Sequence, residues 1–433
     1  MIVRELIAKK RAGGELTARE IREVVAGYTR AAISDADMAA LLKAIVLRGM
    51  TARETADLTL AMVESGERLD LSRIPGSTVD KHSTGGVGDK TTLVVAPLVA
   101  SFGVPVPKMS GRALGHTGGT IDKLECIPGL TTDLSPERFC DQVAEIGLAI
   151  AAQTADMAPA DGKIYALRDA TATVESIPLI ASSVMSKKLA VGADGIVLDV
   201  KAGKGAFISD VAAATRLAEA MVEIGTRAGK RVVALVTRMD EPLGRAVGDA
   251  LELAEAIDTL RGGGPGDFVH LCEIVAGYML VLGGAARDAA EGKALARRGL
   301  LEGSGLSKLR EMIERQGGDA GVVDDPGGLT ANAMQTPVRP TAYGYVSAID
   351  GRRIGLAVRG LKAAAGGQKA LCGLILHKKT GDGVASGEPA ATVLSPSDAR
   401  GAAEEAGREV ADAFRMDERA PSAPDLLAAV VEA

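Results

Sequence analysis

Short β-like runs alternate with helix-length segments over much of the chain after Pro75, and this alternation restricts the fold more than any other feature. The β-like runs cover residues 78–80, 104–106, 148–152, 195–200 and 231–237, and helical patterns lie between them at 91–102, 136–146 and 209–225. Such alternation is typical of a mostly parallel sheet covered by helices, with ligand-binding loops at the carboxyl ends of the strands. The sequence therefore predicts an α/β domain whose chemistry lies on loops.

The first 66 residues instead predict a group of helices. Thr17, Ser34 and Thr51 each stand three residues before an acidic residue and open an apolar-periodic stretch, which is the pattern of a capping box. Residues 161–190 return to a helical pattern, broken at Pro178, and are expected to rejoin these helices. We predict a discontinuous helical domain, 1–68 plus 160–190, that faces a larger mixed α/β domain, 75–155 plus 193–335, across a cleft.

The last hundred residues have a third pattern. Segments 344–351 and 373–384 are short alternating runs divided by Gly and Asp-Gly turns, and a helical stretch follows at 397–414. Such turns are typical of short antiparallel strands. We predict a C-terminal β-rich α+β subdomain over residues 336–433.

Composition excludes several classes of partner. The net charge is −6 with a pI of about 5.5, which argues against nucleic-acid or anionic-membrane binding. No apolar run approaches the ~20 residues of a membrane span, and the first residues lack an apolar signal core. The four cysteines are widely spaced, which indicates reduced thiols rather than a zinc site or disulfides. We expect a cytoplasmic enzyme without nucleic-acid or membrane partners.

The densest chemical signal is the segment 79–92, a β-like start followed by a glycine-rich loop and a helix. Its glycines permit close backbone approach, Ser83 and Thr92 offer hydroxyl groups, and Lys81 offers a positive charge. Together with a helix N-terminus, these groups are suited to hold a phosphate. The segment is neither a Walker loop nor a G-x-G-x-x-G fingerprint, so ATP and NAD are not expected. The alternative is a purely structural glycine turn.

A second glycine-rich segment, 108–125, follows the next strand. Ser110 and Thr120 are its hydroxyl donors, and two such loops at neighbouring strand ends are expected to close on one oxyanion. His116 in this segment is either catalytic or a hydrogen-bonded brace of the loop, and we favour the brace.

A third group lies in the interrupting helices. Ser183 and Lys187 are four residues apart and share a helix face, and together with Arg168 they suit a neutral ligand that becomes anionic during a reaction. The alternative is a solvated basic face. A further loop at 201–207 ends in Phe207, which either lies against a flat ring or belongs to the core.

The segments 81–92 and 110–125 resemble the thymidine phosphorylase and pyrimidine-nucleoside phosphorylase family, and the resemblance extends over the whole chain. It implies a helical domain facing an α/β domain and an active homodimer. Lys108 matches the position that separates substrate ranges, and a lysine there is similar to the broad type. The implied reaction is the reversible phosphorolysis of uridine, thymidine and deoxyuridine to free base and (deoxy)ribose 1-phosphate.

The resemblance also implies residue roles. Phosphate, as co-substrate, is expected to be held by Lys81, Ser83, Thr92, Lys108, Ser110 and Thr120. The base is expected to be held by His82, Arg168, Ser183 and Lys187, which are also the expected catalytic residues, with Phe207 as a further base contact.

Broad members of the family bind a potassium ion near the hinge, and the matching positions here include Gly88, Leu243, Ala246 and Glu255. The family usually has a threonine where this chain has Lys90. An ammonium group beside Glu255 would repel a second cation in a partly buried site. We therefore expect that no cofactor is required and that potassium is not bound.

Two alternatives remain. An anthranilate phosphoribosyltransferase-like enzyme has a similar layout and a Gly-Thr-Gly-Gly loop, but the group Arg168, Ser183 and Lys187 and the β-rich C-terminal part suit a phosphorylase better. A non-catalytic nucleoside or phosphate sensor would bind its ligand without consuming phosphate.

Overall fold

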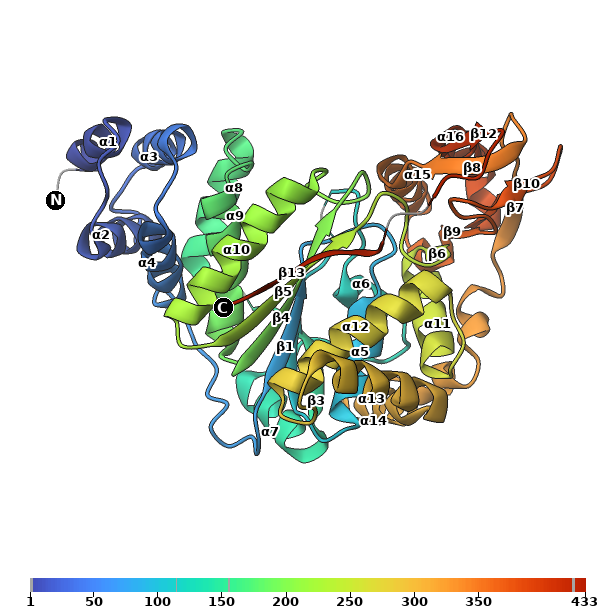
Figure 1. Cartoon of the computed structure of the whole chain (residues 1–433), viewed down its shortest axis with the longest axis horizontal. Coiled ribbons are helices and arrows are strands. Elements are labelled where there is room, and N and C mark those ends of the chain that lie inside the picture. The colour runs from blue at the N-terminus through green and yellow to red at the C-terminus, as the bar shows by residue number, and fades with distance from the viewer. Residues whose placement is uncertain (1–2, 114, 155, 423–424) are drawn as a thin grey trace.

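The computed structural model describes residues 3–113, 115–154, 156–422 and 425–433. Met1 and Ile2 of the predicted helical domain and Leu114 of the second glycine-rich segment lie outside these ranges. A helical part lies at one end of the molecule, an α/β part in the middle, and a smaller C-terminal part at the other end (Figure 1). This is the predicted fold class. None of the helices in the described ranges has both the length and the apolar character needed to cross a membrane.

The helical part is built from two separate stretches of chain. Its helices are α1 (Val3–Arg11), α2 (Ala18–Thr29), α3 (Asp35–Arg48), α4 (Ala52–Val63), α8 (Pro159–Ala170) and the start of α9 (Ile177–Val191). Thr17 and Thr51 form complete capping boxes with Glu20 and Glu54, as predicted, while Ser34 caps α3 through its side chain alone.

The helices α8 and α9 join the N-terminal helices through apolar contacts. Ala160, Ile164 and Leu179 belong to the same buried cluster as the apolar faces of α1 to α4. The break between α8 and α9 lies at 171–176, and Pro178 sits in the first turn of α9 rather than at the break. The predicted position of the break was wrong. Proline has no backbone N–H, but the N–H groups of the first helical turn have no partner within the helix, so proline is tolerated there.

The central sheet is mostly parallel. Its strands are β1 (Val79–Ser83), β4 (Gly195–Ala202), β5 (Arg231–Arg238) and β13 (Leu427–Glu432), in the order β1-β4-β5-β13, and β2 (Val106–Ser110) pairs separately with β3 (Leu148–Ala152). The first three strands and the pair β2–β3 are parallel, whereas β13 is antiparallel to β5. Val79 N donates to Pro105 O at 2.9 Å, which brings β1 beside the start of β2.

Helices bury both faces of this sheet, which explains its nearly continuous apolar strands. Along β4, Val197 packs in one apolar cluster with α5 and α12, while Ile196 and Leu198 pack in a second cluster with α9 and α10. The helices of this part are α5 (Thr91–Ala100), α6 (Thr120–Leu124), α7 (Pro136–Ile146), α10 (Val211–Arg227), α11 (Asp249–Leu260), α12 (Gly266–Leu282), α13 (Ala289–Glu302) and α14 (Ser304–Arg315).

Two of the functionally important strands are displaced from their predicted ranges. We predicted a strand at 78–80, but β1 continues through Lys81, His82 and Ser83, which pair with Val197, Leu198 and Asp199 of β4. We predicted 104–106, but β2 runs to Ser110. Apolar patterning misses such residues because backbone pairing, not side-chain hydrophobicity, holds them in the sheet.

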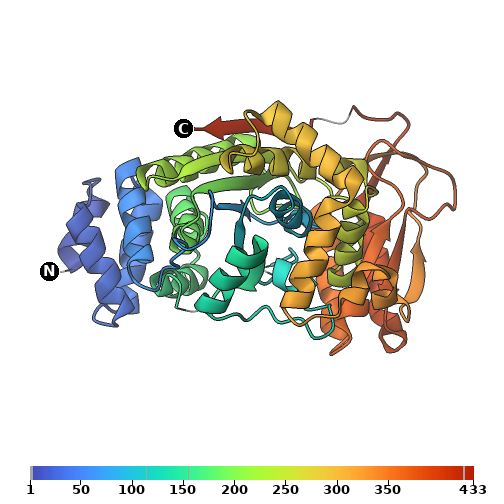
Figure 2. The same ribbon diagram turned by 90° about the horizontal axis from the view of Figure 1, so that it is seen from below.

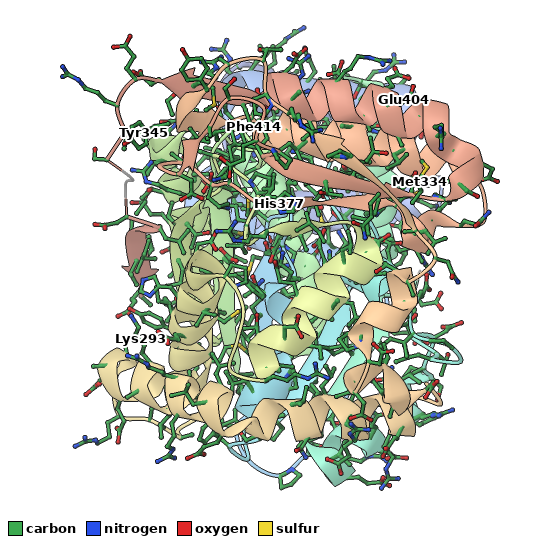
Figure 3. The ribbon with its side chains drawn as sticks, turned by 90° about the vertical axis from the view of Figure 1, so that its right-hand side faces the viewer. Lys293, Met334, Tyr345, His377, Glu404 and Phe414 are labelled. Carbon is green, nitrogen blue, oxygen red and sulfur yellow. The ribbon has the colours of Figure 1, made fainter. Side chains whose placement is uncertain are left out.

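The C-terminal part contains more helix than predicted. Three elements precede this part: β6 (Ala246–Val247) in the loop after β5, η1 (Ala320–Val323) and η2 (Pro326–Thr330). Its own elements are β7 (Met334–Val338), β8 (Gly344–Ile349), α15 (Gly351–Ala364), η3 (Lys369–Leu371), β9 (Gly373–Leu376), β10 (Gly383–Val384), β11 (Ala391–Ser395), η4 (Ser397–Ala399), α16 (Arg400–Ala413) and β12 (Phe414–Asp417). Helix α15 was missed because Asp350-Gly351 was interpreted as a turn, whereas Asp350 caps this helix. Figure 3 shows Phe414, which is buried, inside this part, and Tyr345 and Glu404 toward its surface.

The chain end does not stay in the C-terminal part. Strand β13 returns to the central sheet, where Val430 pairs with Leu235 of β5 (Figure 2). In the C-terminal part, the sheet β6-β9-β11-β7 includes β6, which belongs to the loop that follows β5 of the central sheet. The predicted subdomain 336–433 therefore exchanges one strand in each direction with the α/β part.

Candidate active site

The carboxyl ends of β1, β2 and β4 carry the polar residues that the sequence singled out. Ser83 ends β1, Ser110 ends β2 and Lys201 is the next-to-last residue of β4. Because β1 and β4 are parallel neighbours, their carboxyl ends lie at one edge of the central sheet, and Lys108 of β2 lies beside Asp80 of β1, with Nζ 3.5 Å from Oδ1. Thr84 N donates to Asp199 O at 3.0 Å and Lys201 N to Thr84 Oγ1 at 2.9 Å, which joins the first glycine loop to the end of β4.

Lys81 is the most unusual residue at this edge. Its side chain is 1% exposed, and its Nζ lies 3.6 Å from Asp199 Oδ2 and 3.9 Å from Asp89 Oδ1. Within the described residues this Nζ makes no hydrogen bond. Burial alone would raise the pKa of Asp89, but Lys81 and Lys201 hold it well below its usual range. The cluster thus keeps a buried cation whose donors are free for an anionic ligand.

The predicted hydroxyl residues lie at the ends of two strands, β1 and β2, and in the first turns of two helices, α5 and α6. Ser83 Oγ accepts a hydrogen bond from Gly85 N at 3.1 Å, and Thr92 is buried in the first turn of α5. Thr120 is the first residue of α6, and Ile121 N donates to Gly111 O at 3.4 Å, so that the start of α6 lies beside the residue that follows Ser110. The start of α6 thus lies beside the end of β2, and Ser83 lies against the first glycine loop; that these residues together bind phosphate stays a prediction.

Lys108 belongs to a buried charge network at the same edge. Its Nζ lies 3.5 Å from Asp80 Oδ1 and donates to Met109 O at 2.9 Å, while Lys188 Nζ of α9 donates to Asp80 Oδ2 at 2.8 Å. Burial, reinforced by the charge of Lys188, lowers the pKa of Lys108 to about 7. Burial alone would raise the pKa of Asp80, but Lys108 and Lys188 lower it below its usual range. The pair Asp80–Lys188 joins α9 to β1.

His82 stands within the field of both groups of cations. Burial lowers the pKa of His82 well below 6.5, and the charges of Lys188, Lys108, Lys81 and Lys187 lower it further. The imidazole is therefore neutral near pH 7 and offers one N–H donor and one nitrogen acceptor. Lys188 Nζ of α9 donates to Asp80 Oδ2 of β1 and to Met109 O of β2, so that α9 lies against both strands.

Asp161 of α8 lies between the predicted base-binding residues of α8 and α9. Lys187 Nζ forms an ion pair with Asp161 and lies 3.5 Å from Ser183 Oγ. The guanidinium of Arg168 is 1% exposed and donates to Thr173 O, Val174 O and Leu179 O, which fixes its plane. Burial lowers the pKa of Arg168. The three predicted residues thus share one region, together with an acidic residue.

Phe207 lies with the glycine loops rather than with these helices. Its side chain is 50% exposed, and a Cβ on Gly85 would meet its ring at 3.2 Å. The rings of His116 and Phe207 have centroids 5.3 Å apart, and His116 Nε2 lies 3.3 Å from Gly205 O. These contacts agree with the brace that we favoured for His116.

Comparison with known proteins assigns the helical part and the α/β part to glycosyl transferase families. The family described as "Glycosyl transferase family, helical bundle domain" matches residues 4–66, and "Glycosyl transferase family, a/b domain" matches residues 75–306. The pyrimidine-nucleoside phosphorylase of Geobacillus stearothermophilus is 50% identical over 395 residues, which cover 90% of this chain and 91% of that protein. The chain belongs to the pyrimidine-nucleoside phosphorylase family. The resemblance found from the sequence is confirmed.

Other relatives support the same family. The pyrimidine-nucleoside phosphorylase of Bacillus subtilis (strain 168) is 49% identical over 395 residues, covering 90% of this chain and 91% of that protein. Among solved structures, the anthranilate phosphoribosyltransferase of Thermus thermophilus superposes with a TM-score of 0.59 at 23% identity, covering 72% of this chain and 98% of that one. This second similarity concerns the fold alone.

The residues that match the potassium site of this family do not fit a potassium ion in this chain. Leu243 O, Ala246 O and Glu255 Oε2 converge, but the atom between them is Lys90 Nζ, at 2.9, 3.0 and 2.5 Å. A second cation within these ligands would lie against the ammonium group. Among the described residues, no group of three or more His, Cys, Asp or Glu side chains is arranged to hold a metal ion.

Several charged residues of the site were missed from the sequence. Asp80 and Asp199 are completely buried in strands, and Asp161 is 1% exposed on α8. A usable signal existed for Asp199, because a carboxylate within the apolar run 195–200 must find a cation when it is buried. No such signal marked Asp161, whose partner Lys187 comes from the next helix.

Proposed function

We propose that the protein catalyses the reversible phosphorolysis of pyrimidine nucleosides (uridine, thymidine and deoxyuridine) to the free base and ribose or deoxyribose 1-phosphate. Inorganic phosphate is the co-substrate, and no other cofactor is required. Family membership and the 50% identity to a pyrimidine-nucleoside phosphorylase support this reaction. The observation in the structure that carries the proposal is the ammonium group of Lys81 in β1, which is buried between Asp89 and Asp199 and makes no hydrogen bond within the described residues.

Lys81 supplies the charge that an inorganic phosphate needs at the strand ends. In this proposal the hydroxyl groups of Ser83 and Ser110, at the ends of β1 and β2, and of Thr92 and Thr120, in the first turns of α5 and α6, add neutral donors. A phosphate held there exchanges its hydration shell for fixed donors and a buried cation, so little reorganisation is needed when it reacts. Proximity to C1′ of the nucleoside then supplies a large part of the rate.

Lys187, Arg168 and Ser183 act on the leaving base. Negative charge grows on the pyrimidine ring as its bond to C1′ breaks, and the two cations and the hydroxyl group stabilise that charge at the ring carbonyls and N3. Because these interactions strengthen in the transition state, they raise kcat rather than only lowering KM. Asp161 holds Lys187 in place through its ion pair.

His82 contributes as a neutral hydrogen-bond donor to a base carbonyl. Its lowered pKa keeps a further positive charge away from a site that already contains several lysines. Because of this lowered pKa, little imidazolium is present near pH 7. His82 therefore assists the leaving base by donating a hydrogen bond rather than by acting as a general acid.

The proposal assigns phosphate to the α/β domain (75–155 plus 193–335) and the base to the helical domain (1–68 plus 160–190). Reaction then requires the two domains to approach each other, which expels water from the reacting groups. The presence of Lys108 supports the broad substrate range that a lysine at this position implies.

The proposal includes a homodimer in the cytoplasm. Helices α3 and α4 expose Val46, Leu47 and Leu60, and the Leu47 side chain is 70% exposed, which supports a protein partner for this part. All four cysteines are free thiols, as suits a reducing compartment.

The test is phosphate-dependent release of uracil and thymine from their ribo- and deoxyribonucleosides. We expect release only with phosphate, and we expect Arg168→Ala and Lys187→Ala each to lower kcat/KM by about a hundredfold or more. Lys293→Ala, at a lysine of α13 that contacts Glu273 and His270 of α12, is the matched control and should leave kcat/KM unchanged.

Three results would contradict the proposal. Near-normal rates in both variants would remove the base-side assignment. Binding of uridine without consumption of phosphate would indicate a sensor. Transfer from phosphoribosyl pyrophosphate to anthranilate, with no nucleoside cleavage, would indicate a phosphoribosyltransferase.

A further inference from the structure

The ammonium group of Lys90 lies in a cage of oxygen atoms between the first glycine loop and the connection from β5 to α11. The Lys90 side chain is 0% exposed, and its Nζ donates to Leu243 O at 2.9 Å and to Ala246 O at 3.0 Å. The third oxygen is Glu255 Oε2 at 2.5 Å, and the ring of Phe268 lies 5.1 Å from Nζ. An ammonium group has three donors, and this cage supplies three acceptors.

The surrounding backbone is shaped around this group. Gly244 has φ +68°, and a Cβ at this position would stand 2.3 Å from Glu255 Oε2 and 3.0 Å from Lys90 Nζ. Glu255 Oε1 also accepts from Arg245 N at 3.0 Å and from Ala246 N at 3.1 Å. The carboxylate thus fixes both the lysine and the backbone that provides the carbonyl groups.

The cage is connected to the glycine loop that the site uses. Leu243 N donates to Val87 O at 3.0 Å, and a Cβ on Gly88 would stand 2.6 Å from Leu243 O. Lys90 directly precedes α5, and the preceding Asp89 lies beside Lys81. A change in the cage therefore moves the loop that carries the candidate phosphate residues.

Backbone carbonyls and a carboxylate converging on one point are also the ligands of a monovalent metal cation. In this chain the point is filled by a covalently attached cation. We propose that Lys90 is a built-in replacement for a bound potassium ion: it holds the β5–α11 connection against the glycine loop and makes the protein independent of monovalent cations. Lys90 is accordingly a positioning residue, since its ammonium group is fully used by the cage.

The first experiment tests whether a free monovalent cation can replace the ammonium group of Lys90. Melting temperature and KM for phosphate are measured in chlorides of potassium, ammonium, sodium and tetramethylammonium at equal ionic strength, for the wild type, Lys90→Ala and Lys90→Thr. Tetramethylammonium is too large for the cage and gives the cation-free reference. Lys293→Ala is the matched control, because Nζ of this lysine of α13 contacts Glu273 and His270 of α12 rather than the oxygen atoms of the cage.

We expect the wild type to have the same melting temperature and KM in all four salts. In tetramethylammonium, Lys90→Ala and Lys90→Thr should melt at lower temperature and show a KM for phosphate raised about tenfold or more, because the loop loses its anchor. Potassium or ammonium should restore both quantities with a saturable concentration dependence, as expected for binding to the folded state. Lys293→Ala should behave as the wild type does.

A structural readout is independent of activity, so that its failure is distinguishable from failure of the proposed function. Crystals of Lys90→Thr grown with rubidium should show anomalous scattering between Leu243 O, Ala246 O and Glu255, and wild-type crystals should show none there. Rubidium bound at this point in the wild type, or saturable potassium activation of the wild type, would overturn the proposal. Lys90 variants with the wild-type melting temperature and KM in tetramethylammonium would also overturn it. So would variants that remain unfolded in each of the four salts, because potassium would then not replace the ammonium group.

Discussion

Lys108 should make the stability of this protein depend on pH in a direction opposite to that of an ordinary ion-paired lysine. Its side chain is 4% exposed, and its pKa is lowered from 10.5 to about 7 in the folded state. Below about pH 7 both states hold the proton, and the native state bears the full cost of a buried charge. Between about pH 7 and 10.5 only the unfolded chain holds it, so the free energy of unfolding rises with pH.

The size of this effect follows from the shift. A difference of about 3.5 pH units at about 1.4 kcal/mol per unit gives roughly 5 kcal/mol as an upper limit. Lys108→Met keeps the aliphatic volume and removes the charge, but it loses the hydrogen bond to Met109 O, which contributes about 1 kcal/mol. The variant should therefore be more stable than the wild type by up to about 4 kcal/mol near pH 6, and less stable by about 1 kcal/mol only near pH 11, above the pKa of the unfolded lysine.

The assay is urea unfolding of both proteins across this range, in which the groups common to both cancel in the difference. Lys293→Met, at an exposed lysine of α13, is the matched control, and its difference from the wild type should stay within about 0.5 kcal/mol at every pH. The reasoning would be refuted if the difference in free energy of unfolding between Lys108→Met and the wild type were the same at low and high pH. A buried lysine that keeps its proton over the whole range would give such a constant difference.

Two further predictions concern the helical part and the glycine loop. Glu54 accepts hydrogen bonds from the buried Lys10 and from Leu16 N, so Glu54→Gln should lower the free energy of unfolding by about 3–5 kcal/mol in urea. Adding Lys10→Met should recover part of this loss, and a double variant as unstable as the sum of its parts would contradict the pairing. Gly88→Ala should cost about 1–2 kcal/mol for its left-handed backbone alone, and more for the contact with Leu243 O. A thermal melt of this variant that coincides with the wild type would show that the loop can move away from Leu243.

The order of secondary structure could be predicted well where apolar periodicity is strong. The strand at 148–152 and the helix at 136–146 have the predicted bounds. The strand is an uninterrupted apolar run, and the helix begins at Pro136 after its cap Ser135 and ends before Gly147. The predictions failed where polar residues continue an element. Lys81 to Ser83 belong to β1 because they pair with β4, and α15 begins after an Asp-Gly that the sequence indicated as a turn.

The candidate site could be predicted only for residues that act through local context. Glycine, hydroxyl and lysine residues at the strand ends indicated a phosphate site without any knowledge of the partner strands. The acidic partners were missed, because Asp80 pairs with Lys188 across 108 positions and Asp161 with Lys187 across 26. Pairing over such separations depends on how helices and strands are packed.

The amino-acid sequence by itself determined the chemistry at the loops and the alternation of elements, since both depend on residue type and on spacing along a few turns or strand residues. Only the tertiary structure decided which charges are buried together. Folding brings the ammonium group of Lys90 to carbonyl groups more than 150 positions away and leaves that of Lys81 without a hydrogen bond at the strand ends. The physical reason is that burial makes the state of each charge depend on all of its neighbours in space, whatever their place in the chain.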